Sequence, residues 1–167
     1  MNILLLLQSV LAFSIGIVSL YFVYVIVRWY LYKMIKIANE NEAFAIFKAG
    51  IILASANLMS SVTGPGINVI RFLNQENIAM KSVLLSLGYV GLFVIIGMLF
   101  SFLVIAGGII VLFQLTHVNE WQELKNNNLK TALISAALII GLSLIMREQV
   151  GMVCEMFIPY PQVMQVN

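Results

Sequence analysis

The sequence contains no aspartate, one histidine and one cysteine, Cys154, so most of the side chains used in catalysis are scarce. A Ser/His/Asp triad cannot be built without aspartate, and a single cysteine excludes an internal disulfide. Charge is equally scarce, because nine Lys and Arg and seven Glu are spread over 167 residues without a run of five basic residues. We therefore expect neither an enzyme nor a nucleic-acid-binding protein.

Metal binding is also not expected. His117 and Glu120 are three residues apart, a spacing that occurs in the metal sites of helical bundles. Such a site needs further ligands from a second helix, and the earlier polar turn offers only Glu40 and Glu42. We expect no catalytic residue, no metal and no other cofactor, and we interpret His117 as a solvated side chain.

Hydrophobic residues make up 62% of the chain, and its mean hydropathy is +1.02. Apolar stretches of 18 or more residues recur along the chain, and stretches of this length are typical of membrane-spanning helices. The first stretch has no positively charged start and is longer than a signal-peptide core, so we expect it to be retained as a membrane helix. The sequence predicts an all-α, multi-pass membrane protein with four transmembrane helices, at residues 3–32, 43–63, 82–115 and 129–146.

The predicted spans alternate long, short, long and short, which indicates a duplication. A shift of 86 residues aligns the second span with the fourth, placing Ile52, Leu53, Leu58 and Met59 on Leu138, Ile139, Leu144 and Ile145. Two spans per unit make this a parallel repeat of two helical hairpins. We expect a first repeat at 1–63, an extracytoplasmic linker at 64–81, a second repeat at 82–146 and an extracytoplasmic tail at 147–167.

The distribution of positive charge predicts the orientation. Short loops rich in Lys and Arg stay in the cytoplasm. The turns after the first and third spans, with their flanks, carry six such residues and the other side three: Arg28, Lys33, Lys36, Lys48, Lys125 and Lys130, against Arg71, Lys81 and Arg147. Both termini are therefore expected outside the cytoplasm. Trp29 and Trp121 fit this arrangement, because Trp favours the level of the membrane interface.

The longest polar passage, residues 116–130, is the second cytoplasmic turn in this arrangement. Its three asparagines, 126–128, are suited to cap the following helix. The run Asn119-Glu120-Trp121-Gln122-Glu123-Leu124-Lys125-Asn126-Asn127-Asn128 resembles a turn of the YjfL family of small bacterial inner-membrane proteins. Thr116-His117 before it and the small residues Thr131, Ser135, Ala136 and Gly141 after it fit the same family.

The resemblance covers most of residues 1–150, more loosely in the first half, and leaves 64–81 and 151–167 unmatched. It implies a tandem pair of two-helix units in the bacterial inner membrane, and an association with membrane-stress proteins. It implies no substrate, because the family is one of unknown function. We expect a partner-binding turn formed by six residues: His117, Asn119, Glu120, Trp121, Lys125 and Asn127.

A stripe of small and polar residues runs along the second span at helical spacing: Gly50, Ala54, Asn57 and Ser61. Asn57 lies near the expected midplane, where an amide needs a partner. Similar stripes occur on the first span, at Ser9, Ala12, Gly16 and Ser19, and on the third, at Gly97, Ser101 and Gly108. They favour close helix packing. Lining of a polar path by Asn57 is the alternative that the pattern leaves open.

Two functions follow from these patterns. The first is a non-catalytic, homo-oligomeric module of the inner membrane that binds a cytoplasmic or membrane protein. The second is a small oligomeric channel or transporter with a polar path near Asn57. In both functions the protein is surrounded by the lipid bilayer.

Overall fold

The computed structural model describes residue 10 and residues 14–25, 28–29, 41–73, 80–115 and 120–159 of the chain. This part is helical and contains no strand. A short apolar helix, Ser14–Val25, precedes four further helices: α2 (Glu42–Leu73), α3 (Met80–Leu115), α4 (Glu120–Lys125) and α5 (Leu129–Met156).

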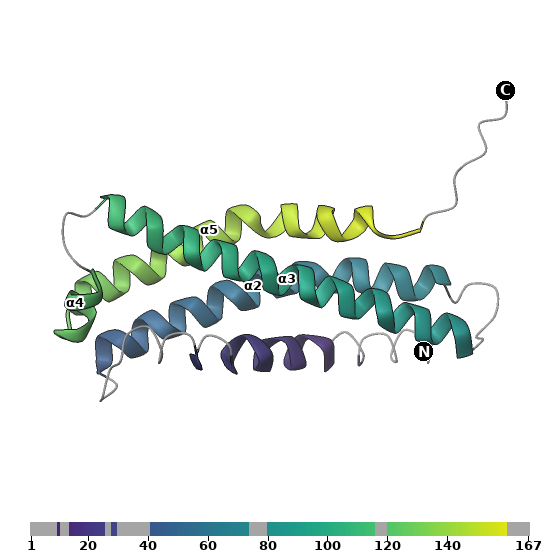
Figure 1. Ribbon diagram of the computed structural model, residues 1–167, viewed down its shortest axis with the longest axis horizontal. Helices are drawn as coiled ribbons and strands as arrows, with labels where there is room; N and C mark the ends of the chain where they lie inside the picture. The colour runs from purple at the N-terminus through teal and green to yellow at the C-terminus, as the bar shows by residue number, and fades with distance from the viewer. Residues whose placement is uncertain are drawn as a thin grey trace, which may run out of the picture.

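The long helices lie side by side, with α2 in contact with both α3 and α5 (Figure 1). α2 and α5 are parallel, because Gly50 meets Ala136 and Asn57, two turns later, meets Ser143. α3 runs antiparallel to α2: Gly97 packs on Met59, and the earlier residue Val90 packs on Gly66. α4 lies across the end of the molecule at which α2 and α5 begin.

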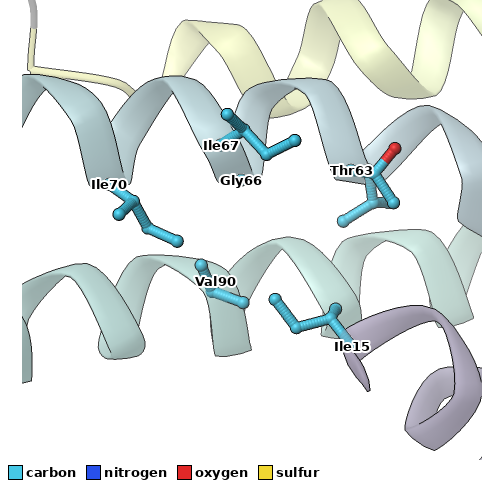
Figure 2. A pocket seen from close by; sticks show the side chains of 7 residues that line it. Ile15, Thr63, Gly66, Ile67, Ile70 and Val90 are labelled. Carbon is cyan, nitrogen blue, oxygen red and sulfur yellow. The ribbon is translucent and has the colours of Figure 1, made fainter. Parts of the chain in front are cut away.

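The Ser14–Val25 helix is held against α2 at two levels. Near its end, the ammonium of Lys48 lies 5.6 Å from the centre of the Tyr24 ring, a cation–π contact. Near its start, Ile15 lines a small cavity together with Gly66 of α2 and Val90 of α3 (Figure 2). The order of these contacts makes this helix antiparallel to α2.

Three helices, α2, α3 and α5, are long and apolar enough to cross a membrane. This supports the expectation of a helical membrane protein. Of the predicted first span, 3–32, only residue 10 and residues 14–25 and 28–29 fall within the described part, and the 12 residues of Ser14–Val25 form an apolar helix.

The expectation of short second and fourth helices is wrong. α2 has 32 residues and α5 has 28, against 36 in α3. Residues 64–73, expected in a linker, continue α2, and residues 147–156, expected in the tail, continue α5. The second predicted span ends at Thr63, just before Gly64-Pro65-Gly66, but Pro65 lies inside α2. Proline is tolerated in membrane helices because neighbouring helices and Ser or Thr side chains compensate for the lost backbone bond.

The core lies between α2 and its neighbours and has two clusters. The first surrounds Phe47 and Ile51 near the α4 end, and the second surrounds Leu58, Val62 and Phe93 farther along. Both clusters join residues of α2 to residues of α5. The chain thus folds around α2.

Candidate functional site

Among the glycines of the described structure, Gly50 on α2 comes closest to a neighbouring helix, at Ala136 on α5. A Cβ atom added to Gly50 would lie 2.5 Å from Ala136 Cβ and 2.8 Å from Ala136 Cα. Real Cβ atoms do not approach backbone atoms so closely, so only glycine fits here without a shift of the helices. Small residues allow this proximity, which drives helix association in membranes through van der Waals contact.

Two turns farther along, the same seam contains an interhelical hydrogen bond. Nδ2 of Asn57 donates to Oγ of Ser143 over 3.2 Å. Ser143 is fully buried and donates in turn to the carbonyl oxygen of Ile140. The amide of Asn57 therefore points into the seam between α2 and α5.

The seam continues past Asn57 to the proline. Pro65 has no N–H, so the carbonyl of Ser61, four residues earlier, cannot receive its usual helical bond. Gly151 of α5 approaches this carbonyl, because a Cβ added there would lie 3.7 Å from Ser61 O. The hydroxyl of Ser61 bonds to Leu58 O. α5 thus passes close to the freed carbonyl at Gly151, where even a Cβ would be in ordinary van der Waals contact.

The structure brings the four residues of the predicted stripe to one seam. Gly50, Asn57 and Ser61 each contact α5, and Ala54 between them is only 1% exposed. On α3, Gly97 and Gly108 face neighbouring helices: a Cβ at Gly97 would meet Val62 Cγ2 at 2.8 Å, and one at Gly108 would meet Ile139 Cγ1 at 2.8 Å. Ser101 is also buried.

Ser55 is a buried polar residue that the sequence reasoning missed. It is 0% exposed, and its hydroxyl oxygen has no hydrogen-bond partner in the described structure. Ser55 precedes Met59, which packs on Gly97 of α3, by one turn, so it lies on the side of α2 that faces α3. A signal existed in the spacing Ser55, Met59 and Val62, which forms a second face of α2 beside the predicted stripe.

The polar turn before α5 is joined to the start of α2 by asparagines. Asn41 Nδ2 donates to Leu124 O at 2.8 Å and to Lys125 O at 3.1 Å, while its Oδ1 accepts from Phe44 N. Asn127 Oδ1 accepts from Ala43 N at 2.9 Å, and Asn127 has a left-handed φ of 60°. Left-handed backbone favours Asn over most other residues with a side chain. Asn127 of the turn therefore caps the start of α2, and Asn41 before α2 bonds in return to the carbonyls at the end of α4.

The start of α5 has its own cap, as the sequence predicts for one of the three asparagines. Asn128 Oδ1 accepts from Lys130 N and Thr131 N, and its Nδ2 donates to Glu123 at 2.6 Å. Capping satisfies N–H groups that the helix itself leaves unpaired. This accounts for much of the polarity of the turn.

The residues of the predicted partner-binding turn are placed in different environments. The ring of Trp121 packs edge-on against Phe47, with centroids 6.0 Å apart, and is partly buried against the core. Lys125 is exposed, and Asn127 is used in the cap of α2. Glu120 begins α4, but its side chain lies outside the described residues, as do His117 and Asn119.

Metal-binding groups do not gather in residues 10, 14–25, 28–29, 41–73, 80–115 and 120–159: no three His, Cys, Asp or Glu side chains lie close enough to hold an ion. Cys154 is a free thiol buried in the second core cluster. No protein family matches the chain, and no curated protein or solved structure is detectably similar to it.

Proposed function

We propose that this chain is a non-catalytic protein of the bacterial inner membrane, related to the YjfL family, that forms homo-oligomers and binds a partner protein through its polar turn. The observation that carries the proposal is the hydrogen bond from Asn57 to Ser143. The most polar group of the α2 stripe has its partner within the same chain, so the seam needs no water to satisfy it. This favours a packed module over a channel.

The proposed tandem repeat is supported by two contacts. Asn57 and Ser143 are 86 residues apart, and so are Gly50 and Ala136, the same offset that aligns the second span with the fourth. In a parallel helix pair related by a two-fold axis, equivalent positions meet at the crossing. We therefore propose that the two hairpins are related by an approximate two-fold axis along the seam.

The proposed partner surface is the outer side of the turn. Gln122, Lys125 and Lys130 are exposed, whereas Trp121 packs on Phe47 and the side chains of Asn127 and Asn128 bond within the chain. Two lysines close to an amide favour a partner with an acidic surface. In the proposed topology this surface faces the cytoplasm and both termini lie on the other side.

A photo-crosslinking residue placed at Gln122 tests the partner surface. In cells, irradiation should join the chain to one defined protein, and the charge reversal Lys125→Glu should weaken that product several-fold. The control position is Glu148, an exposed residue in the later half of α5 and far from the turn along the helix, where the same product should not form. Equal products at both positions, or none at either, would contradict a specific partner at the turn.

A second measurement separates the module from the channel. The purified protein in planar bilayers should show no ion conductance, and Asn57→Leu should leave the partner crosslink intact. Conductance that disappears in Asn57→Leu would replace the module with the channel.

A further inference from the structure

An open apolar groove runs between the Ser14–Val25 helix and α3. It has a volume of about 480 Å³, and its walls are formed by residues from both helices: Ile15, Val18 and Phe22 on one side and Val90, Gly91 and Met98 on the other. Gly91 widens the groove, because nothing lies within 4 Å of the position that its Cβ would occupy. An apolar groove of a membrane-spanning protein cannot be filled by water, so a hydrophobic occupant is required.

The groove offers its occupant no hydroxyl donor. Its two hydroxyl groups both donate within their own helix: Ser14 to Val10 O at 2.8 Å, and Ser19 to Ile15 O at 2.6 Å. A peptide carbonyl or another polar acceptor would therefore stay unpaired there, which is unfavourable in apolar surroundings. The surface therefore fits a hydrocarbon chain.

The length of the groove distinguishes an acyl chain from a helix of another protein. From Val90 to Met98 the rise of α3 is about 12 Å, and the hydrocarbon core of a bilayer is ~30 Å thick. Met98 lies at the middle of α3, midway between Met80 and Leu115. The groove thus extends from the middle of the helix through about one leaflet. A partner's transmembrane helix would cross both leaflets, whereas an acyl chain ends at the midplane.

A positive charge lies where the headgroup of such a lipid would be. Lys81 is exposed and precedes Val90 by about 14 Å of helix rise, and a lysine side chain can extend along the helix toward the interface. Ammonium groups near the membrane surface attract anionic lipids. We propose that this groove binds one acyl chain of an anionic phospholipid, in the leaflet next to the start of α3, with its headgroup near Lys81.

The bound lipid differs from the surrounding lipid in its number of protein contacts. An acyl chain in the groove touches two helices, while an acyl chain on the outer face of α3 touches one, so the bound lipid makes more van der Waals contacts with the protein. The bound acyl chain also fixes the Ser14–Val25 helix against α3, because it fills the space between the two helices.

Gly91→Leu tests the proposal, because it adds a side chain to the wall of the groove at a position where a Cβ meets no atom within 4 Å. The matched control is Gly88→Leu, which is exposed on the same helix, also meets no atom within 4 Å and does not line the groove. Wild type and both variants are purified in mild detergent, and the phosphatidylglycerol retained per chain is measured by native mass spectrometry. We expect Gly91→Leu to lower retention at least five-fold and Gly88→Leu to leave it unchanged.

Lys81→Ala gives the headgroup arm of the same experiment. It should remove the preference for phosphatidylglycerol over phosphatidylcholine, while a lipid with a photoreactive acyl chain still crosslinks to the groove. Equal retention in all variants, or an equal loss in Gly91→Leu and Gly88→Leu, would overturn the site. A change in oligomeric state in Gly91→Leu with unchanged lipid would also overturn it, because a second copy would then occupy the groove. None of these results bears on the partner surface at the polar turn.

Discussion

α2 and α3 are helices of similar length, but the less hydrophobic of the two, α2, is the more buried. An apolar 18-residue stretch of α3 has a mean hydropathy of 2.8, and the corresponding stretch of α2 has 1.6. Yet only 22% of the stretch in α3 is buried, against 50% of the stretch in α2. In water the more hydrophobic helix would lie inside. In a bilayer, lipid tails are as apolar as leucine, so hiding leucine gains nothing and close contact between small and polar residues decides which helix is central.

The residues of α2 illustrate this rule. Gly50 allows the approach of α5, Asn57 bonds across the seam, and Pro65 leaves a carbonyl that Gly151 covers. α3 is exposed along much of its length and contacts its neighbours through a few positions such as Gly97 and Gly108. Exposed large side chains on α3 are therefore suited to acyl chains.

The largest effect is expected at Gly50. Gly50→Leu places a branched side chain where even a Cβ would lie 2.8 Å from Ala136 Cα, a backbone atom that cannot move alone. Overpacking of a tight core costs ~1–3 kcal/mol, and contact with backbone places this variant at or above the upper end. We expect loss of the folded protein in detergent, measured by size-exclusion chromatography.

Gly141→Leu on α5 is the control for that variant, because a Cβ there meets nothing within 4 Å. It adds the same bulk to a membrane helix and should fold normally. Equal behaviour of Gly50→Leu and Gly141→Leu would mean that α2 and α5 are not in contact at Gly50.

The sequence allowed the prediction of the membrane-helical character and the stripe, because hydrophobic length and the spacing of small residues are local patterns. The length of α2 could not be predicted, since the proline of Gly64-Pro65-Gly66 is tolerated only when a neighbouring helix is present to compensate. For Ser55 the spacing with Met59 and Val62 marks a second face of α2, but it does not show that α3 covers this face and buries the serine.

The polar turn likewise has one feature that could be predicted from the sequence and others that could not. An asparagine cap of α5 was predicted from the run 126–128, and Asn128 forms it. The bond from Asn127 to Ala43 and the packing of Trp121 on Phe47 join segments about 80 residues apart, and the sequence contains no sign of that proximity. The partner-binding role of the turn stays a prediction.

A smaller effect is expected at Gly97, the corresponding tight position of α3. A Cβ there would meet Val62 Cγ2 at 2.8 Å and the end of the Met59 side chain at 3.1 Å. Methionine is flexible and adapts to added volume, so Gly97→Ala should cost only about 1 kcal/mol. Thermal unfolding followed by tryptophan fluorescence measures this. A loss of stability as large as that of Gly50→Leu would instead show that α3 packs on α2 as tightly as α5 does.

The hydrogen bond in the seam should contribute a modest amount. Interhelical bonds in membranes are worth ~0.6–2 kcal/mol, so Asn57→Leu and Ser143→Ala should each lower the free energy of unfolding by that amount. Because both variants remove the same bond, the double variant should cost less than the sum of the two single ones. Strict additivity would mean that the two side chains do not interact. A folded Asn57→Leu protein that has lost a cellular activity would favour the polar path.

The smallest effect is expected on the exposed face of α3, and it sharpens the comparison by using one residue type in both helices. Leu99 of α3 is 59% exposed, whereas Leu58 of α2 is 0% exposed and belongs to the second core cluster. Leu99→Ala exchanges contacts with lipid for other contacts with lipid, so the free energy of unfolding should change by less than ~0.5 kcal/mol. Leu58→Ala leaves a cavity among packed helices and should cost ~2 kcal/mol or more. Both are measured by SDS titration in the same mixed micelles, where a difference in slope would reveal a change in the unfolded state. If Leu99→Ala destabilises the protein as much as Leu58→Ala, this face of α3 is covered by protein, and a second copy of the chain is the first occupant to test by crosslinking.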